Sequence, residues 1–243
     1  MGERRPPLRG EVNIVAGYVG VPETGKSTLA MLHARSLQKN PGAYVVAHDI
    51  GYRLPDKLPV GGKVEIRRFD DAVAAGKALG AGPQAGIVVV DTWEPETVLA
   101  LAESIPERQW KGQPPGEQRA FPAVLLIDEV AEVPGIKAAR LGDEWNRLLA
   151  RRRHMSVIFL WTTQRASMAH YSLGTLATDL FLFRVVSDKD FKRLDEMMVS
   201  EEALAILPTL ENHHYVHYKV GRQEQDLTVK TGLCPILSEK AKK

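Results

Sequence analysis

A glycine-rich segment near the start of the chain has the spacing of a phosphate-binding loop. Residues 20–27, GVPETGKS, fit the pattern G-x4-G-K-[ST]. The segment follows an apolar run and precedes a helical pattern, so main-chain amides and a helix N-terminus can surround a triphosphate. In that geometry the Lys26 ammonium contacts the β and γ phosphates, and the Ser27 hydroxyl holds Mg²⁺. The predicted nucleotide-binding residues are Gly20, Val21, Pro22, Glu23, Thr24, Gly25, Lys26, Ser27 and Thr28.

Two adjacent acids follow a second apolar run, residues 123–127. In a P-loop fold a carboxylate at the end of such a strand holds the water shell of the metal ion, which makes Asp128 the second predicted Mg²⁺ residue. A glutamate directly after it can accept a proton from an attacking water molecule, and Glu129 has that position. The pair therefore favours hydrolysis over phosphoryl transfer to a small acceptor, the reaction of a metabolite kinase.

A third apolar run, residues 156–163, is followed by Gln164. In a parallel sheet its carboxyl end lies at the same edge as the ends of the strands before Lys26 and Asp128. An amide there can donate to the γ-phosphate and accept from water, so we expect Gln164 to position the nucleophile.

The elements that must hold these residues alternate between strand and helix, which is typical of an α/β domain with a mostly parallel central sheet flanked by helices. The expected strands are 12–18, 43–50, 63–69, 86–93, 123–130, 156–163 and 180–186. Apolar spacing predicts helices at 26–38, 72–79, 97–104, 136–153 and 189–198. Beyond residue 208, HHYVHYKV and DLTVK alternate with period two around GRQEQ and predict a C-terminal β-hairpin.

Length and composition fit one domain with an embellishment. The chain has 243 residues, and we expect a basic N-terminal arm at 1–10, a core at 11–198, and a C-terminal helix, hairpin and tail at 199–243 packed on the core. The net charge of +2 does not by itself identify a nucleic-acid binder. A single cysteine, Cys234, excludes an internal disulfide framework. The longest apolar runs, such as AVLLI and VIFLW, fall far short of the roughly 20 residues that span a bilayer, so no transmembrane segment is expected.

Three segments together resemble the HerA/FtsK superfamily of P-loop ATPases. They are GYVGVPETGKSTLA, VLLIDEV and RRRHMSVIFLWTTQRASMAHYSLGTLATDLFLFRVVSDKDFKRL, and the resemblance extends over residues 11–195. Within the superfamily, the small size and the RRRH before the glutamine strand are most similar to the genome-packaging ATPases of tailless, membrane-containing icosahedral viruses. The resemblance implies a RecA-like P-loop NTPase core that hydrolyses ATP with Mg²⁺.

The resemblance also implies partners and a location. Members form homo-oligomeric rings, here a hexamer or a pentamer, and move double-stranded DNA without regard to sequence. A capsid vertex or a viral membrane protein is the implied docking partner, and the cytoplasm of the host cell or a packaging vertex of the virion is the implied place. A plasmid or conjugative DNA pump shares every catalytic residue and stays an open alternative, while a small-molecule kinase fits the motifs less well.

Family members also use an arginine that reaches into the site of the neighbouring subunit. By motif this residue maps onto Arg153, but Arg151 and Arg152 adjoin it, and Ser156 stands where the family usually has glycine. The choice among the three arginines stays open. A solvated cationic helix end, favoured by the helix dipole, is the alternative reading of the run.

If the subunits form a ring, the loops after the acidic pair and after Gln164 can face its channel. Lys137, Arg140 and Arg165 are the candidate DNA contacts in these loops, which also hold His170 and Tyr171. Such cations follow phosphates without reading bases, as a motor that moves any sequence requires. Ordinary surface charge is the alternative explanation for them.

Overall fold

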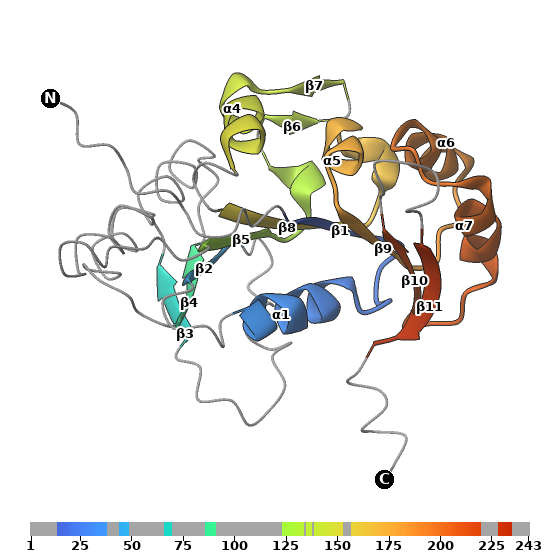
Figure 1. The fold of residues 1–243 in the computed structure, drawn as a ribbon, viewed down its shortest axis with the longest axis horizontal. Coiled ribbons are helices and arrows are strands. Elements are labelled where there is room, and N and C mark those ends of the chain that lie inside the picture. Colours follow the sequence, from blue (N-terminus) through green and yellow to red (C-terminus); the bar gives the residue numbers. More distant parts are fainter. Residues whose placement is uncertain are drawn as a thin grey trace, which may run out of the picture.

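The computed structural model describes residues 14–37, 44–48, 66–69, 86–90, 123–133, 135–137, 139–152, 157–219 and 228–234, and within these one large β-sheet carries the fold. Its strands are β1 (Val15–Val19), β2 (Tyr44–His48), β3 (Ile66–Phe69), β4 (Gly86–Val90), β5 (Ala123–Ile127), β8 (Val157–Thr163), β9 (Asp179–Leu182), β10 (His214–Lys219) and β11 (Thr228–Leu233). Their order across the sheet is β11-β10-β9-β1-β8-β5-β2-β4-β3 (Figure 1).

From β9 to β3, every pair of neighbouring strands is parallel. Only β10 and β11 are antiparallel, and they form the C-terminal hairpin at one edge. The mostly parallel sheet and the hairpin predicted from the sequence are therefore confirmed. Strands β1, β8 and β5, which precede the three motifs, are direct neighbours, so the motifs meet at one edge of the sheet.

Strand β8 shows why these apolar runs become central strands. Successive side chains point to opposite faces of a sheet, and a strand buried on both faces needs apolar residues throughout. Val157, Phe159 and Trp161 pack into one core, whereas Ile158 and Leu160 pack into the other. All five are at most 2% exposed.

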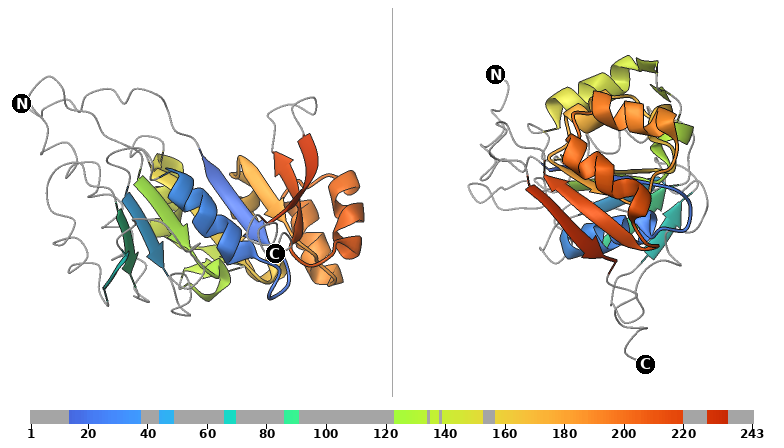
Figure 2. Two further views of the ribbon diagram at one scale, coloured as in Figure 1. Left: turned by 90° about the horizontal axis from the view of Figure 1, so that it is seen from below. Right: turned by 90° about the vertical axis from the view of Figure 1, so that its right-hand side faces the viewer.

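Helices cover both faces of the sheet (Figures 1 and 2). Helix α1 (Lys26–Leu37) packs on one face, and its Leu29, Met31 and Ala34 belong to the smaller core. The other face carries α4 (Asp143–Arg151), α5 (Ser172–Thr175), α6 (Asp188–Glu196) and α7 (Glu201–Ile206). The short 3-10 helices are η2 (Val130–Glu132), η3 (Ala166–Met168) and η4 (Leu207–Thr209).

Aromatic rings attach the C-terminal hairpin to the sheet. Phe181 of β9 stacks on Tyr18 of β1 and on His217 of β10, with ring centroids 5.0 and 4.4 Å apart. Nε2 of His217 also lies 2.8 Å from Oδ1 of Asp179. These contacts hold β10 against the same strands that carry the motifs.

The helix predicted at residues 136–153 is wrong in its first part. The chain instead forms a hairpin of β6 (Ile136–Lys137) and β7 (Arg140–Leu141), and α4 begins only at Asp143. Ile136, Leu141 and Trp145 have nearly helical spacing, but Gly142 is extended, with ψ 154°, and ends the strand. The predicted helices at 72–79 and 97–104 and the arm at 1–10 lie outside the described residues.

Candidate active site

The glycine-rich loop joins β1 to α1 and is fixed to two neighbouring segments. The Gly20 N–H donates to the Thr163 carbonyl at 3.2 Å, and the Val21 N–H donates to the Arg184 carbonyl at 3.0 Å. A Cβ at Gly20 would lie 2.6 Å from Cβ of Phe183, so only glycine fits there. The loop therefore has the strand-to-helix setting that phosphate binding requires.

Lys26 lies inside this loop. It is 6% exposed, and its Nζ donates to the Val21 carbonyl at 2.7 Å. Thr24 Oγ1 donates to the same carbonyl at 2.8 Å. The ammonium group is thereby held within the turn, beside the N-terminus of α1, where both would attract a phosphate chain.

The structure brings together the two predicted metal residues. Ser27 Oγ donates to Oδ1 of Asp128 at 2.7 Å, and Thr162 Oγ1 donates to the same oxygen at 2.8 Å. Thr162 Oγ1 also accepts from the Glu129 N–H at 2.9 Å. The hydroxyl of Ser27 and the carboxylate of Asp128 are hard oxygen donors, the kind that Mg²⁺ prefers, so the residues present fit this ion.

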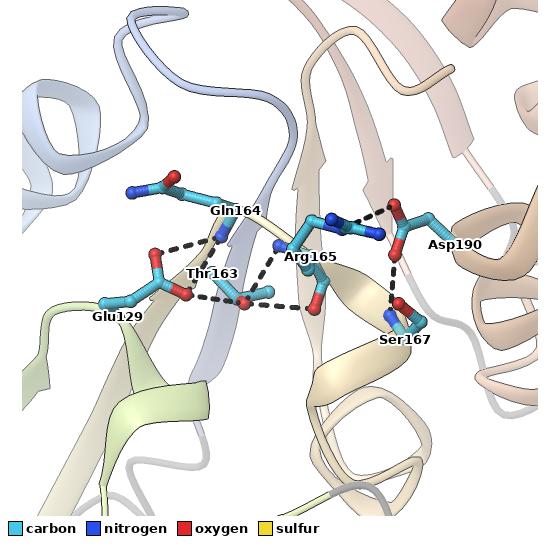
Figure 3. Close-up of polar contacts among 6 residues, drawn as sticks. All are labelled: Glu129, Thr163, Gln164, Arg165, Ser167 and Asp190. Atoms are coloured by element: carbon cyan, nitrogen blue, oxygen red, sulfur yellow. Dashed lines mark hydrogen bonds and ion pairs between the residues drawn. The ribbon is translucent and has the colours of Figure 1, made fainter. Parts of the chain in front are cut away.

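Glu129 is held by the end of strand β8 (Figure 3). Its carboxylate accepts from Thr163 Oγ1 at 3.0 Å and from the Gln164 N–H at 3.0 and 3.1 Å. Its backbone is left-handed, with φ 51°, which is uncommon outside glycine. Burial raises the pKa of Glu129, while the Gln164 N–H, the Thr163 hydroxyl and the charge of Lys26 oppose that rise.

Gln164 contacts Glu129 through its main chain, and its side chain is exposed at the same edge of the sheet. The structure thus brings Lys26, Ser27, Asp128, Glu129 and Gln164 to one edge, as the motifs predict. An exposed amide beside a positioned carboxylate can contact both a phosphate oxygen and a water molecule.

Arg165, predicted to contact DNA, has an internal partner. Its Nε lies 3.6 Å from Oδ2 of Asp190 on α6, and its side chain is 56% exposed (Figure 3). Asp190 is buried and its Oδ1 accepts from the Ser167 N–H at 2.8 Å. Since the Arg165 N–H donates to Thr163 Oγ1 at 3.3 Å, one chain of contacts links Glu129 to α6.

The other predicted cationic residues differ in exposure and in how much of each the structure describes. Arg140 is exposed on β7 and is directly opposite Lys137 in the β6–β7 register. Arg152 is 6% exposed, and its Nη1 donates to the Leu149 carbonyl. Arg153 lies outside the described residues, and of Arg151 only the backbone, in α4, is described. Burial makes Arg152 the poorest candidate for reaching a neighbouring subunit.

Sequence reasoning missed the groups that orient the acids. The sequence pattern predicts Thr162 and Thr163 only as the end of a strand, and Asp190 only as part of a helix. A pair of threonines directly before the glutamine is a usable signal, because successive strand residues face opposite sides and each hydroxyl can then reach a different acid.

None of the helices that the structure describes is long and apolar enough to cross a membrane.

No family model matches the sequence, and no curated protein is significantly similar to it. Solved structures do match. The genome packaging NTPase B204 from Sulfolobus turreted icosahedral virus 2, solved in complex with AMPPCP, has a TM-score of 0.67 and 16% identity, over 90% of this chain and 96% of that chain. B204 from Sulfolobus turreted icosahedral virus, a DNA-packaging ATPase, has a TM-score of 0.62 and 18% identity, over 91% and 98%.

A secretion protein matches less closely. The cytoplasmic domain of the type VII secretion ATPase EccC from Thermomonospora curvata has a TM-score of 0.53 and 11% identity, and the match covers 92% of this chain but 24% of that chain. At these identities the likenesses establish the fold. The expected α/β fold, a mostly parallel central sheet flanked by helices, matches these P-loop NTPases, and the resemblance to packaging ATPases holds at the level of the fold.

Proposed function

We propose that this chain is an ATP-hydrolysing motor that moves double-stranded DNA, with the packaging of a viral genome as its task. The observation that carries the proposal is the pair of acids at the end of β5, each fixed by its own hydroxyl from β8, beside the lysine-bearing loop. The fold shared with B204, a genome-packaging NTPase, supports DNA as the substrate that is moved.

ATP would bind with its phosphates along the loop. Lys26 and the main-chain amides at the start of α1 hold the triphosphate, and Gly20 to Thr28 form its cradle. Ser27 and Asp128 are the residues that would hold Mg²⁺, whose charge offsets the negative charge of the phosphates. Thr162 keeps Asp128 and the main chain of Glu129 in place.

Glu129 accepts the proton of the attacking water. The Thr163 hydroxyl and the Gln164 N–H fix the direction of its carboxylate, and burial raises its pKa, which makes it a better proton acceptor than an ordinary glutamate. The exposed amide of Gln164 orients the water against the γ-phosphate. A carboxylate so placed favours hydrolysis over phosphoryl transfer to a small acceptor.

The β6–β7 hairpin and Arg165 would touch DNA. Lys137 and Arg140 are register partners in this hairpin, and two basic residues in one short element favour a nearby anion. A phosphate backbone supplies that anion at any sequence.

Several parts of the proposal concern the assembly. The chain would work as a hexameric or pentameric ring in the host cytoplasm, docked at a capsid vertex or viral membrane protein and carried into the virion. Residues 11–198 would form the motor core, with the arm at 1–10 and the segment 199–243 attached to it. Arg153 would enter the site of the next subunit. A plasmid or conjugative pump would use the same residues.

The test measures ATP hydrolysis by the purified full chain with and without double-stranded DNA. We expect DNA to stimulate the rate, Lys26→Ala to weaken nucleotide binding, and Glu129→Gln to bind nucleotide but lose about 10²- to 10⁴-fold in rate. Near-normal turnover by Glu129→Gln would refute the assignment of the base. A rate that ignores DNA and depends on a small acceptor would mean a kinase, and one that responds only to a polypeptide would mean a secretion motor.

A further inference from the structure

The C-terminal hairpin packs directly against the phosphate loop, although the two are far apart in the sequence (Figure 2). A Cβ built on Gly25 would lie 3.3 Å from Nδ1 of His213, and 3.5 Å from Cβ and Sγ of Cys234. Gly25 has φ +96° and immediately precedes Lys26. The imidazole of His213 therefore lies next to the part of the loop that binds phosphate.

His213 is held in place by its main chain. Its φ is +68°, a left-handed conformation that is uncommon outside glycine and that asparagine, aspartate and histidine adopt more often than other residues. The Cys234 N–H donates to the His213 carbonyl at 3.0 Å, and the His214 N–H donates to the Glu211 carbonyl at 3.1 Å. Strain of this kind persists only where the surroundings impose it, and it is often found at binding sites.

The imidazole of His213 can donate a hydrogen bond through a ring N–H. The side chain is partly buried, and among the residues that the structure describes no group forms a hydrogen bond with its ring. The nearly fully buried Cys234 lies against the same glycine.

We propose that His213 is a nucleotide-binding residue that donates an imidazole N–H to the phosphate chain held by the loop. This inference rests on the proposed function, since it assigns a further ligand to the same site. The C-terminal hairpin is then part of the nucleotide site, since His213 and Cys234 at its ends lie against the loop. The strained turn is explained as well, because it is what directs the ring at Gly25.

The strain allows binding and folding to be separated. His213→Gly removes the ring and relieves the left-handed backbone, so it should raise resistance to urea while it weakens nucleotide binding. His213→Asn tolerates the same backbone and serves as the second variant. His214→Asn is the matched control, since His214 adjoins His213 but its Nδ1 faces Glu211 at 3.9 Å.

The experiment titrates each full-length variant with a fluorescent ATP analogue and displaces the analogue with tripolyphosphate. Loss of a hydrogen bond to a charged group predicts affinity about tenfold weaker or more in His213→Gly, for both the analogue and tripolyphosphate, and no change in His214→Asn. Unchanged affinity in His213→Gly, or weaker nucleotide binding with unchanged tripolyphosphate affinity, would overturn the proposal. Lys26→Ala distinguishes failure of the proposed function from failure of the role of His213. If Lys26→Ala binds nucleotide like wild type, the proposed function fails. If Lys26→Ala loses binding and His213→Gly does not, only the role of His213 fails.

Discussion

At the scale of single residues, the site depends on two neighbouring hydroxyls that divide the work between two acids. Thr162 donates to Asp128, and Thr163 donates to Glu129. Both threonines are at most 1% exposed. Such supporting hydrogen bonds orient catalytic groups and are worth much more in a buried site than in water.

Replacing each threonine by valine should separate the two acids. Thr162→Val removes a donor from Asp128 and should raise the Mg²⁺ concentration needed for half-maximal ATPase rate by about tenfold or more. Thr163→Val removes one of the two donors that hold the carboxylate of Glu129 and should lower kcat with little change in that concentration. The measurement is ATPase rate against Mg²⁺ concentration for both variants. If the two shift the Mg²⁺ requirement equally, the division of roles is wrong.

At the scale of elements, helix α1 packs against the sheet through His33, whose pKa is lowered by burial. Nδ1 of His33 lies 2.7 Å from the Tyr18 hydroxyl, and its ring packs edge-on against Phe181, with centroids 4.7 Å apart. Burial is the main cause that lowers the pKa of His33 from 6.5 to about 4, and the charge of His217 adds to it, while Asp179 opposes.

This shift predicts a pH-dependent attachment of α1. His33 binds a proton less readily in the folded state than in the unfolded chain. Its contribution to the free energy of unfolding is therefore complete above pH 6.5 and is lost as the pH falls toward 4. His33→Gln keeps an acceptor for Tyr18 but does not titrate. Between about pH 7.5 and about pH 5, wild type should lose about 2 kcal/mol more unfolding free energy than the variant. Urea unfolding at both pH values measures this difference, and equal losses would contradict it.

The contact between η3 and α6 predicts how DNA binding is restrained. Asp190→Asn keeps an acceptor for the Ser167 N–H but removes the charge that holds Arg165. If Arg165 contacts DNA, the variant should bind DNA more tightly at low salt, with a steeper slope of log affinity against log salt. Arg165→Ala should instead flatten the slope by about one unit. Fluorescence anisotropy over a salt series measures the slope for both variants. If the slopes of Asp190→Asn and Arg165→Ala change in the same direction, Arg165 does not contact DNA.

The elements that apolar patterning could predict are those buried on both sides. The strands of the parallel sheet were predictable because β8 and its neighbours read as continuous apolar runs. The β6–β7 hairpin was not, because Ile136 and Leu141 continue the apolar spacing of α4. The acids Asp143 and Glu144, which mark a helix N-terminus, were the better signal. Contacts between distant segments, such as His213 with Gly25, depend on how the whole chain folds and leave no local pattern.

At the scale of the whole molecule, one sheet brings the residues proposed to bind nucleotide, to bind metal and to activate water to the ends of three adjacent strands, β1, β8 and β5. Motors of this kind can also use a cation that a neighbouring subunit supplies. The family resemblance assigns that part to an arginine near the end of α4, and the burial of Arg152 leaves Arg153 and Arg151 as the better candidates. Hydrolysis would then require residues from two neighbouring subunits.

Mixing two inactive variants tests this directly. An arginine supplied by a neighbour is worth on the order of 10³ to 10⁵ in rate, so Arg153→Ala assemblies should be nearly inactive although they bind ATP. Glu129→Gln assemblies should be inactive as well. In mixtures, a subunit with intact Glu129 can lie beside one with intact Arg153, so part of the activity should return and peak at intermediate ratios.

The mixing experiment needs its own controls. Subunit exchange is followed with differently labelled proteins, and sedimentation verifies that both variants assemble. Arg152→Ala is the comparison, because loss of a buried side chain that donates to Leu149 should lower the melting temperature and not complement Glu129→Gln. If exchange occurs and every ratio stays inactive, Arg153 acts within its own subunit or on the fold, and Arg151→Ala is the variant to mix next.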